Sequence, residues 1–219
     1  MKILVIAAHT DDAQFCMGGT IAKFTRAGNT VKMIVAIVPC ENISGIASDK
    51  EKEKHRVLCE KSAKILGADL EILDLDPYQI WFKRDIVKIL DAKTREFSPD
   101  IIFTHWDHDS HQDHVAISNA TFAVTRRNNI SLIMYEQSIH GGITPYSFKP
   151  NLFVDVSDVM DINLESARIY KSLELKGRQW LKAMEGVAAF RGNQIGIRYA
   201  EFFDAVKISW ISRIGLSPF

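Results

Sequence analysis

The chain has 219 residues, of which 47% are hydrophobic and 25% are charged, a composition typical of a globular protein with a full hydrophobic core. Lysine plus arginine and aspartate plus glutamate balance at 27 each, so there is no basic excess of the kind on which nucleic-acid binding rests. No apolar run approaches the roughly 20 residues that span a bilayer, so we expect neither a nucleic-acid partner nor a membrane span.

Strand-like and helix-like segments alternate along the first two thirds of the chain. The expected strands cover residues 3–8, 31–38, 70–75, 101–104 and 132–135. The expected helices cover residues 18–27, 50–66, 86–96 and 115–125. Repeated βα units of this kind form a mainly parallel sheet with helices on both faces, so we predict an α/β fold.

The pattern loosens after about residue 140. A short strand is expected at 153–156, helical structure between 162 and 184, and a final strand at 202–210. Because no linker, repeat or low-complexity stretch interrupts the chain, we expect a single domain over residues 1–219.

The N-terminus and the cysteines bear on location. The first apolar run meets acidic residues at Asp11, too early for a secretory signal peptide, which favours a cytoplasmic protein. Three cysteines without CxxC spacing indicate neither a disulfide framework nor a zinc ribbon. The sequence leaves open whether the chain forms a homo-oligomer.

Two short clusters of histidine and aspartate carry most of the chemical information. Residues 9–12 read His-Thr-Asp-Asp and follow the first expected strand, and residues 111–114 read His-Gln-Asp-His and come soon after the strand at 101–104. Charged side chains are costly to bury unless they are paired or bind a metal. Because ligands of open α/β sheets bind at the carboxyl ends of the strands, the clusters predict one composite metal site.

Zinc in catalytic sites usually has three protein ligands and an open position for water. His9, Asp12 and His114 could supply those ligands. Asp11 would then stand beside the metal, where its carboxylate could accept a proton from the activated water.

The remaining members of the second cluster could complete such a site. His111 as an imidazolium could stabilise an oxyanion or protonate a leaving amine, and Asp113 could orient its ring. The structural alternative is a hydrogen-bonded histidine at a strand end, with Asp12 as a helix N-cap. The joint occurrence of both clusters at strand exits favours the metal site.

These motifs resemble the LmbE-like, or PIG-L, family of zinc-dependent de-N-acetylases. The matching segments are residues 8–12 (Ala-His-Thr-Asp-Asp), Gly18-Gly19, residues 109–114 (Asp-Ser-His-Gln-Asp-His) and residues 196–203 (Gly-Ile-Arg-Tyr-Ala-Glu-Phe-Phe). The resemblance implies a Rossmann-like three-layer sandwich, zinc on His9, Asp12 and His114, and Asp11 as the general base. It also implies an oxyanion-stabilising His111 that Asp113 orients.

The chain departs from the family pattern at a few positions. Thr10 and Gln112 replace prolines, Ala13 replaces a glutamate, and Lys176 stands where many relatives have a histidine. None of these changes removes an expected ligand or the base. The loss of a carboxylate at position 13 could retune the metal.

Substrate contacts are less specific in the sequence. Arg56 lies where relatives carry an arginine that grips substrate hydroxyls, although a solvated helix charge is the alternative. Tyr199 and Trp81 could stack on a sugar ring, but aromatic side chains more often belong to the core.

The resemblance implies a hydrolase that removes the N-acetyl group from an N-acetylglucosamine-type conjugate and uses Zn²⁺, with Fe²⁺ or another divalent metal as an alternative. Two other functions remain open: an amidase that cleaves a larger amide of a sugar-thiol conjugate, and a non-catalytic sugar-binding module with a decayed site. The retained Asp11 argues against decay, because a binder needs no base beside its metal.

Overall fold

A computed structural model describes residues 1–41, 48–137, 144–173 and 179–209. Its seven-stranded sheet has the order β3-β2-β1-β4-β5-β7-β6. The strands are β1 (Lys2–Ala7), β2 (Thr30–Val35), β3 (Asp69–Ile72), β4 (Ile101–His105), β5 (Ser131–Tyr135), β6 (Leu152–Asp155) and β7 (Ala200–Lys207). The first five strands run parallel, and β7 pairs antiparallel with both β5 and β6.

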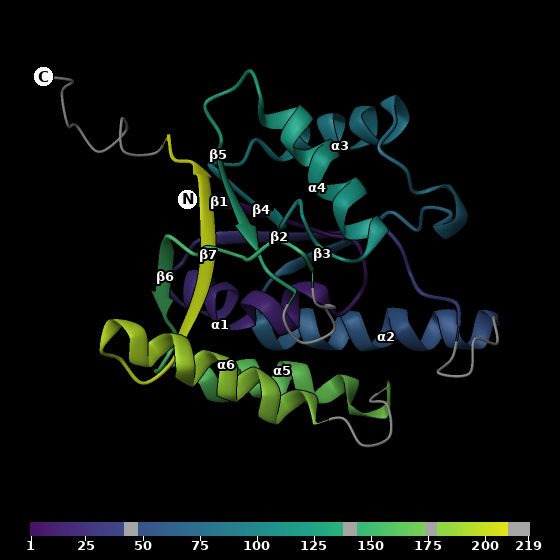
Figure 1. Cartoon of the computed structure of the whole chain (residues 1–219). Helices are drawn as coiled ribbons and strands as arrows, with labels where there is room; N and C mark the ends of the chain where they lie inside the picture. Colours follow the sequence, from purple (N-terminus) through teal and green to yellow (C-terminus); the bar gives the residue numbers. More distant parts are fainter. Residues whose placement is uncertain (42–47, 138–143, 174–178, 210–219) are drawn as a thin grey trace, which may run out of the picture.

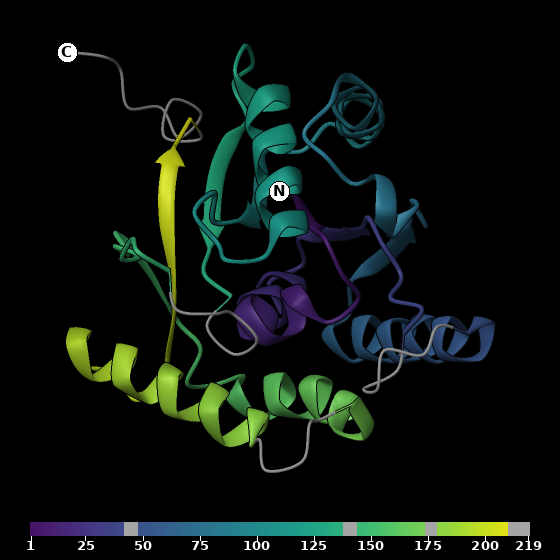
Figure 2. The same cartoon turned by 45° about the vertical axis from the view of Figure 1, so that its right-hand side comes forward.

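Helices cover both faces of this sheet (Figures 1 and 2). They are α1 (Asp12–Arg26), α2 (Asp49–Leu66), the 3₁₀ turn η1 (Pro77–Gln79), α3 (Arg84–Phe97), α4 (Gln112–Thr125), α5 (Met160–Arg168), the 3₁₀ turn η2 (Ile169–Leu173) and α6 (Trp180–Ile195). α3 and α4 lie on one face, and α1, α2, α5 and α6 lie on the other (Figure 1). The predicted α/β fold with helices on both faces is confirmed.

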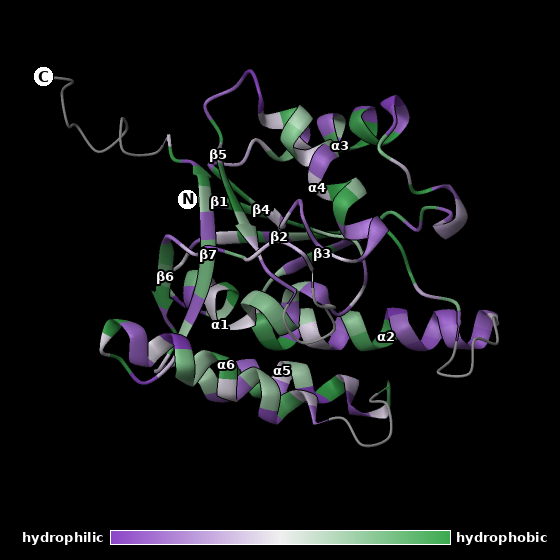
Figure 3. Ribbon diagram, viewed as in Figure 1, coloured by the Kyte–Doolittle hydropathy of each residue, from purple (hydrophilic) through white to green (hydrophobic). Residues whose placement is uncertain are grey.

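The central strands are buried on both sides, which explains their uninterrupted hydrophobic runs. Every residue of β1 after Lys2 is buried, as is the whole of β4 and of β5. The N-terminal part of α2 is by contrast strongly hydrophilic (Figure 3). Within the described residues no helix combines the length and hydrophobicity that a membrane crossing requires.

α1 begins earlier than the sequence pattern predicts. The helix starts at Asp12 rather than at residue 18, and its backbone is kinked at Met17, where φ is −150°. Residues 18 and 19 are a glycine pair, which the sequence pattern places at the start of a helix. In the structure the pair lies inside α1, directly after the kink. The consequence is that Asp12 belongs to the first turn of a helix anchored in the core.

The glycine pair permits close packing between α1 and the C-terminal part of the chain. A Cβ on Gly18 would lie 2.3 Å from Asn163 Oδ1, and one on Gly19 would lie 2.9 Å from Val156 Cβ. The backbone N–H of Gly19 donates to Glu201 Oε1 at 2.8 Å. Asn163 Nδ2 donates to the same oxygen at 2.8 Å, so this buried carboxylate joins α1, α5 and β7.

The remaining boundaries differ from expectation by a few residues. β2 ends at Val35 rather than at 38, and the final strand covers Ala200–Lys207 rather than 202–210. Trp210, the last residue of that expected strand, lies outside the described residues. The helical segment expected between 162 and 184 consists of α5, η2 and the beginning of α6.

Candidate metal centre

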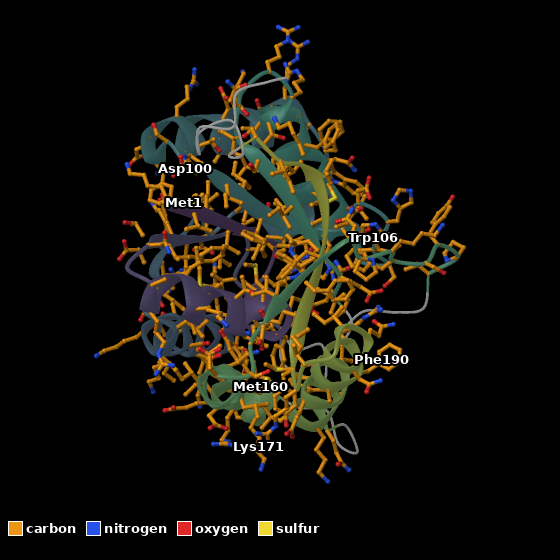
Figure 4. The ribbon with its side chains drawn as sticks, turned by 90° about the vertical axis from the view of Figure 1, so that its left-hand side faces the viewer. Met1, Asp100, Trp106, Met160, Lys171 and Phe190 are labelled. Carbon is orange, nitrogen blue, oxygen red and sulfur yellow. The ribbon has the colours of Figure 1, made fainter. Side chains whose placement is uncertain are left out.

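The two histidine–aspartate clusters follow neighbouring strands. β1 and β4 pair in parallel, with Val5 opposite Phe103, so their carboxyl ends lie at the same edge of the sheet. Figure 4 shows this direction for β4: Asp100, just before the strand, and Trp106, just after it, lie on opposite sides of the molecule. The loops that carry both clusters therefore meet at one edge.

The three side chains predicted to hold a metal lie together. Their potential ligand atoms are all within 4.8 Å of one another. His9 Nδ1 lies 3.2 Å from His114 Nε2 and 3.5 Å from Asp12 Oδ2. His114 Nε2 lies 3.4 Å from Asp12 Oδ1. Two imidazole nitrogens and a carboxylate that converge in this way fit the donor set of a catalytic zinc site.

Each imidazole of this trio has a carboxylate beside its other nitrogen. His114 Nδ1 lies 3.0 Å from Asp109 Oδ2, and His9 Nε2 lies 3.1 Å from Asp113 Oδ2. Carboxylates placed like this orient metal-bound histidines and raise their basicity. Asp113 Oδ2 is 3.9 Å from His111 Nδ1, so its side chain contacts His9 more closely than the expected His111.

Asp12 is only 2% exposed and is held from several sides. Its Oδ2 accepts from the backbone N–H of His9 at 2.6 Å, and its Oδ1 accepts from Gln137 Nε2 at 2.8 Å. Gln137 Oε1 in turn accepts from the thiol of Cys16. His105 Nε2 lies 3.2 Å from Asp12 Oδ2 and accepts from a backbone N–H at 2.9 Å.

Sequence reasoning missed two of these neighbours, Asp109 and Gln137. Asp109 belongs to the matching motif, but the motif does not show that its carboxylate lies beside Nδ1 of His114. Gln137 follows β5 by two residues, so the only available signal was a polar residue just after a buried strand that ends at the same edge.

The ionisable groups of the centre shift one another's pKa values. Burial lowers the pKa of His9, but Asp12 and Asp113 outweigh it and raise that pKa to about 10. Burial likewise opposes Asp12 and Asp109, which raise the pKa of His114 to about 9. Despite its burial, the carboxyl of Asp12 has a pKa well below its usual range because of the surrounding imidazoles. A cation between these groups would take the place of the two imidazole protons.

The centre opens into a cavity of about 540 Å³. Its lining includes His9, Asp11, Asp12, His111, Gln112 and His114. Asp11 occupies the N-cap position of α1, and its side chain makes no capping hydrogen bond. His111 is the N-cap of α4, with Nδ1 accepting from the backbone N–H of Asp113 at 3.2 Å. The expected base and the expected oxyanion-stabilising residue thus border the cavity beside the metal cluster.

The departures at positions 10 and 13 are accommodated in the core. Thr10 is buried, its Oγ1 lies 3.4 Å from His55 Nδ1, and its carbonyl accepts from the hydroxyl of Tyr170 at 2.6 Å. Ala13 is fully buried among apolar side chains. Lys176, the remaining departure in the C-terminal part, lies outside the described residues.

Arg56 and Tyr199, the predicted substrate contacts, are not brought to this cavity wall. Arg56 pairs with Asp74 at 3.1 Å and lines a separate hollow beside β3. Tyr199 is partly buried, and its hydroxyl donates to Glu185 Oε1 at 2.8 Å. Their roles in substrate binding stay predictions.

Comparison with known proteins agrees with the motifs. The sequence profile of the family described as PIG-L: GlcNAc-PI de-N-acetylase matches residues 4–125, and the chain belongs to this family. Among curated relatives, diacetylchitobiose deacetylase of Thermococcus kodakarensis is 30% identical over 216 residues, which cover 91% of this chain and 81% of that protein. The resemblance read from the motifs is confirmed.

Solved structures share the fold at lower identity. N,N′-diacetylchitobiose deacetylase from Pyrococcus horikoshii has a TM-score of 0.81 and 23% identity, with 100% of this chain and 87% of that chain covered. The 4-carboxy-2-hydroxymuconate hydratase GalB of Pseudomonas putida has a TM-score of 0.77 and 20% identity, with 94% and 95% covered. Because the fold serves both a deacetylase and a hydratase, function must be argued from the site.

Proposed function

We propose that the protein is a metal-dependent N-deacetylase that converts an N-acetylglucosamine-type sugar into its free amine and acetate. The observation that carries this proposal is the convergence of His9, Asp12 and His114 in the lining of a cavity that Asp11 also lines. A divalent metal on these three ligands, in the first instance Zn²⁺, supplies a Lewis acid that acidifies water and polarises the amide carbonyl. The chain's membership of the PIG-L family and its similarity to diacetylchitobiose deacetylase support this reaction.

Asp11 is the group that moves the proton. Its carboxylate accepts a proton from the attacking water and later delivers it to the nitrogen of the departing amine, so acetate and a free amine are formed. Asp113 and Asp109 orient His9 and His114 toward the metal position. Of the two carboxylates in the first cluster, Asp12 is the proposed ligand, so Asp11 is the one that lines the cavity without binding the metal.

His111 stabilises the oxyanion as a hydrogen-bond donor. Burial, together with the charges of His9 and His114, lowers the pKa of His111. Its Nδ1 accepts from the backbone N–H of Asp113, so the proton of the neutral ring resides on Nε2. Nε2–H is then the donor available to a developing oxyanion.

The first test is acetate release from N-acetylglucosamine and N,N′-diacetylchitobiose by zinc-loaded protein, with and without a chelator. We expect chelator-sensitive release that zinc restores, and loss of nearly all turnover with retained metal in Asp11→Asn. Reconstitution with Fe²⁺ in place of Zn²⁺ identifies the more active metal.

The same assay separates the rival functions. An amidase would release a larger acid from a sugar-thiol conjugate but no acetate from these sugars, and a hydratase would release neither. Protein that carries one metal ion and binds these sugars but hydrolyses none of them would be a binding module. Normal turnover of Asp11→Asn would remove Asp11 as the base.

A further inference from the structure

The turn of residues 9–12 is held from outside through Thr10, its one residue without a proposed chemical role. Thr10 is fully buried, and its carbonyl oxygen accepts from the hydroxyl of Tyr170 at 2.6 Å. Its Oγ1 lies 3.4 Å from His55 Nδ1. Tyr170 belongs to η2, directly after α5, and His55 belongs to α2; α2 and α5 lie in the same helical layer as α1 (Figure 1). Two distant parts of the chain therefore hold the residue that separates the ligand His9 from the base Asp11.

The hydroxyl of Tyr170 is fixed as a donor to Thr10. The residue is fully buried, and burial raises the pKa of its hydroxyl well above the usual value, so the oxygen keeps its proton. A tyrosine hydroxyl has a single hydrogen, and a carbonyl can only accept. Gln14 Nε2 donates to the same hydroxyl oxygen at 3.1 Å. The aromatic ring packs against Phe15, with ring centroids 5.9 Å apart, inside a small apolar cluster.

This hydrogen bond acts on the peptide group in front of the proposed base. The carbonyl of Thr10 and the nitrogen of Asp11 belong to one planar peptide unit, so Tyr170 fixes the plane that precedes the Asp11 side chain. The next carbonyl, that of Asp11 itself, accepts from the backbone N–H of Phe15 at 3.2 Å. With the backbone held on both sides, the Asp11 carboxylate has few directions in which it can point into the cavity.

The proposed metal ligands are held by a separate set of contacts. Gln137 Nε2 donates to Asp12 Oδ1 at 2.8 Å. The carboxylates of Asp113 and Asp109 stand beside the two ligand histidines. Tyr170 takes part in none of these contacts. Its hydroxyl reaches the site through the backbone of the turn and not through a ligand side chain.

We infer that Tyr170 is a positioning residue for the catalytic base: its hydroxyl fixes the peptide between Thr10 and Asp11 and so aims the Asp11 carboxylate at the reacting water. This inference rests on the proposed function, in which Asp11 takes the proton of that water. Proton transfer requires both atoms to be within hydrogen-bond reach, and a displacement of about 1 Å can cost about 100-fold in rate. A residue 160 positions from Thr10 thereby sets the geometry of the base.

The first test is the kinetics of zinc-loaded Tyr170→Phe with N-acetylglucosamine and N,N′-diacetylchitobiose. The substitution keeps the buried ring and removes only the hydroxyl. We expect kcat to fall about tenfold and KM to change by no more than about twofold, because the lost interaction acts in the transition state and not in substrate binding. The dissociation constant for zinc should stay within about threefold of the wild type, well below the roughly 10- to 100-fold rise expected when a residue supports a ligand.

A second variant reaches the same contact from its other side. Gln14→Leu removes the donor to the Tyr170 hydroxyl and leaves the tyrosine intact, so kcat should fall in the same direction by about threefold. Thr25→Val is the matched control. Thr25 Oγ1 also donates to a carbonyl, that of Leu66 at 2.7 Å, and joins α1 to α2 at the end of α1 far from Asp11. This variant should lose stability and keep its kcat, KM and zinc affinity.

Hydrogen exchange gives a measurement that does not depend on activity. The backbone N–H of His9 donates to Asp12 Oδ2 at 2.6 Å, and that of Phe15 donates to the Asp11 carbonyl, so the segment 9–15 contains hydrogen-bonded amides whose protection can be followed. Tyr170→Phe should raise the exchange rate of this segment with and without zinc, whereas Thr25→Val should leave it unchanged.

The combined results separate failure of the positioning role from failure of the reaction. No acetate release by the wild type would refute the deacetylase, and exchange would still show whether Tyr170 holds the turn. Wild-type kcat in Tyr170→Phe, a loss of zinc affinity that accounts for the lower rate, unchanged exchange of residues 9–15, or an equal loss of rate in Thr25→Val would overturn the positioning role. If Tyr170→Phe does not fold, Gln14→Leu decides: slower turnover with wild-type zinc affinity supports the role, and wild-type turnover overturns it.

Discussion

Gln137→Leu should weaken metal binding although Gln137 is not a proposed ligand. The substitution keeps a buried side chain of similar volume but removes the amide that donates to Asp12 Oδ1 at 2.8 Å. It also leaves the Cys16 thiol without the acceptor that Gln137 Oε1 provides. Asp12 would then hold its metal-facing oxygens less firmly.

The expected size follows from the type of bond that is lost. A hydrogen bond to a charged group contributes about 1.5–3 kcal/mol, and a factor of ten in affinity corresponds to about 1.4 kcal/mol. The dissociation constant for zinc should therefore rise roughly 10- to 100-fold, the range typical of residues that support a metal ligand.

The dissociation constant is best measured by competition with a chromophoric chelator. Gln14→Leu is the matched control, because Gln14 is also buried and donates to the hydroxyl of Tyr170 at 3.1 Å rather than to Asp12. It should lower thermal stability and leave zinc affinity nearly unchanged. A folded Gln137→Leu protein with wild-type affinity, or equal losses in the two variants, would refute the role assigned to Gln137.

Three other outcomes are expected. His114→Ala should stay folded by circular dichroism but lose its metal on dialysis, and full metal content would exclude the residue as a ligand. Burial raises the pKa of Glu201 to about 7, above its value in the unfolded chain. The free energy of unfolding should therefore be highest at low pH and fall by up to about 3 kcal/mol as the pH rises from about 4.5 to 7. Urea denaturation at several pH values should show this decrease in the wild type and not in Glu201→Gln. Gly18→Ala should cost about 1–3 kcal/mol in the same assay because its Cβ would meet Asn163 Oδ1, whereas Gly186→Ala, whose Cβ would meet nothing within 4 Å, should be neutral or stabilising.

The sequence predicted the sheet well because buried parallel strands leave long apolar runs. The strand expected at 132–135 differs from β5 by a single residue, and the helix expected at 50–66 differs from α2 by one. α1 was harder, because the glycine pair at 18–19 permits a close approach to α5 and to Val156, just after β6, that only the tertiary structure reveals.

The proposed ligands could be found from the sequence because strand order brings the ends of β1 and β4 together. The contacts around them could not. Which nitrogen of His9 faces Asp113, and which loop supplies Gln137, depend on side-chain directions that no spacing rule encodes. The same holds for Tyr78, an exposed residue of the 3₁₀ turn η1 that also lines the cavity.

The carboxylate of Glu201 has a consequence for how the protein matures. All three proposed ligands lie within the first 114 residues, but Gln137, Tyr170 and Glu201, which brace the ligand-bearing loop and helix α1, are synthesised later. β7, which carries Glu201, inserts between β5 and β6, so the sheet is complete only after residue 200. A nascent chain would therefore expose its histidines before it can hold an ion tightly, and we expect tight metal binding only after β7 has been synthesised and has joined the sheet.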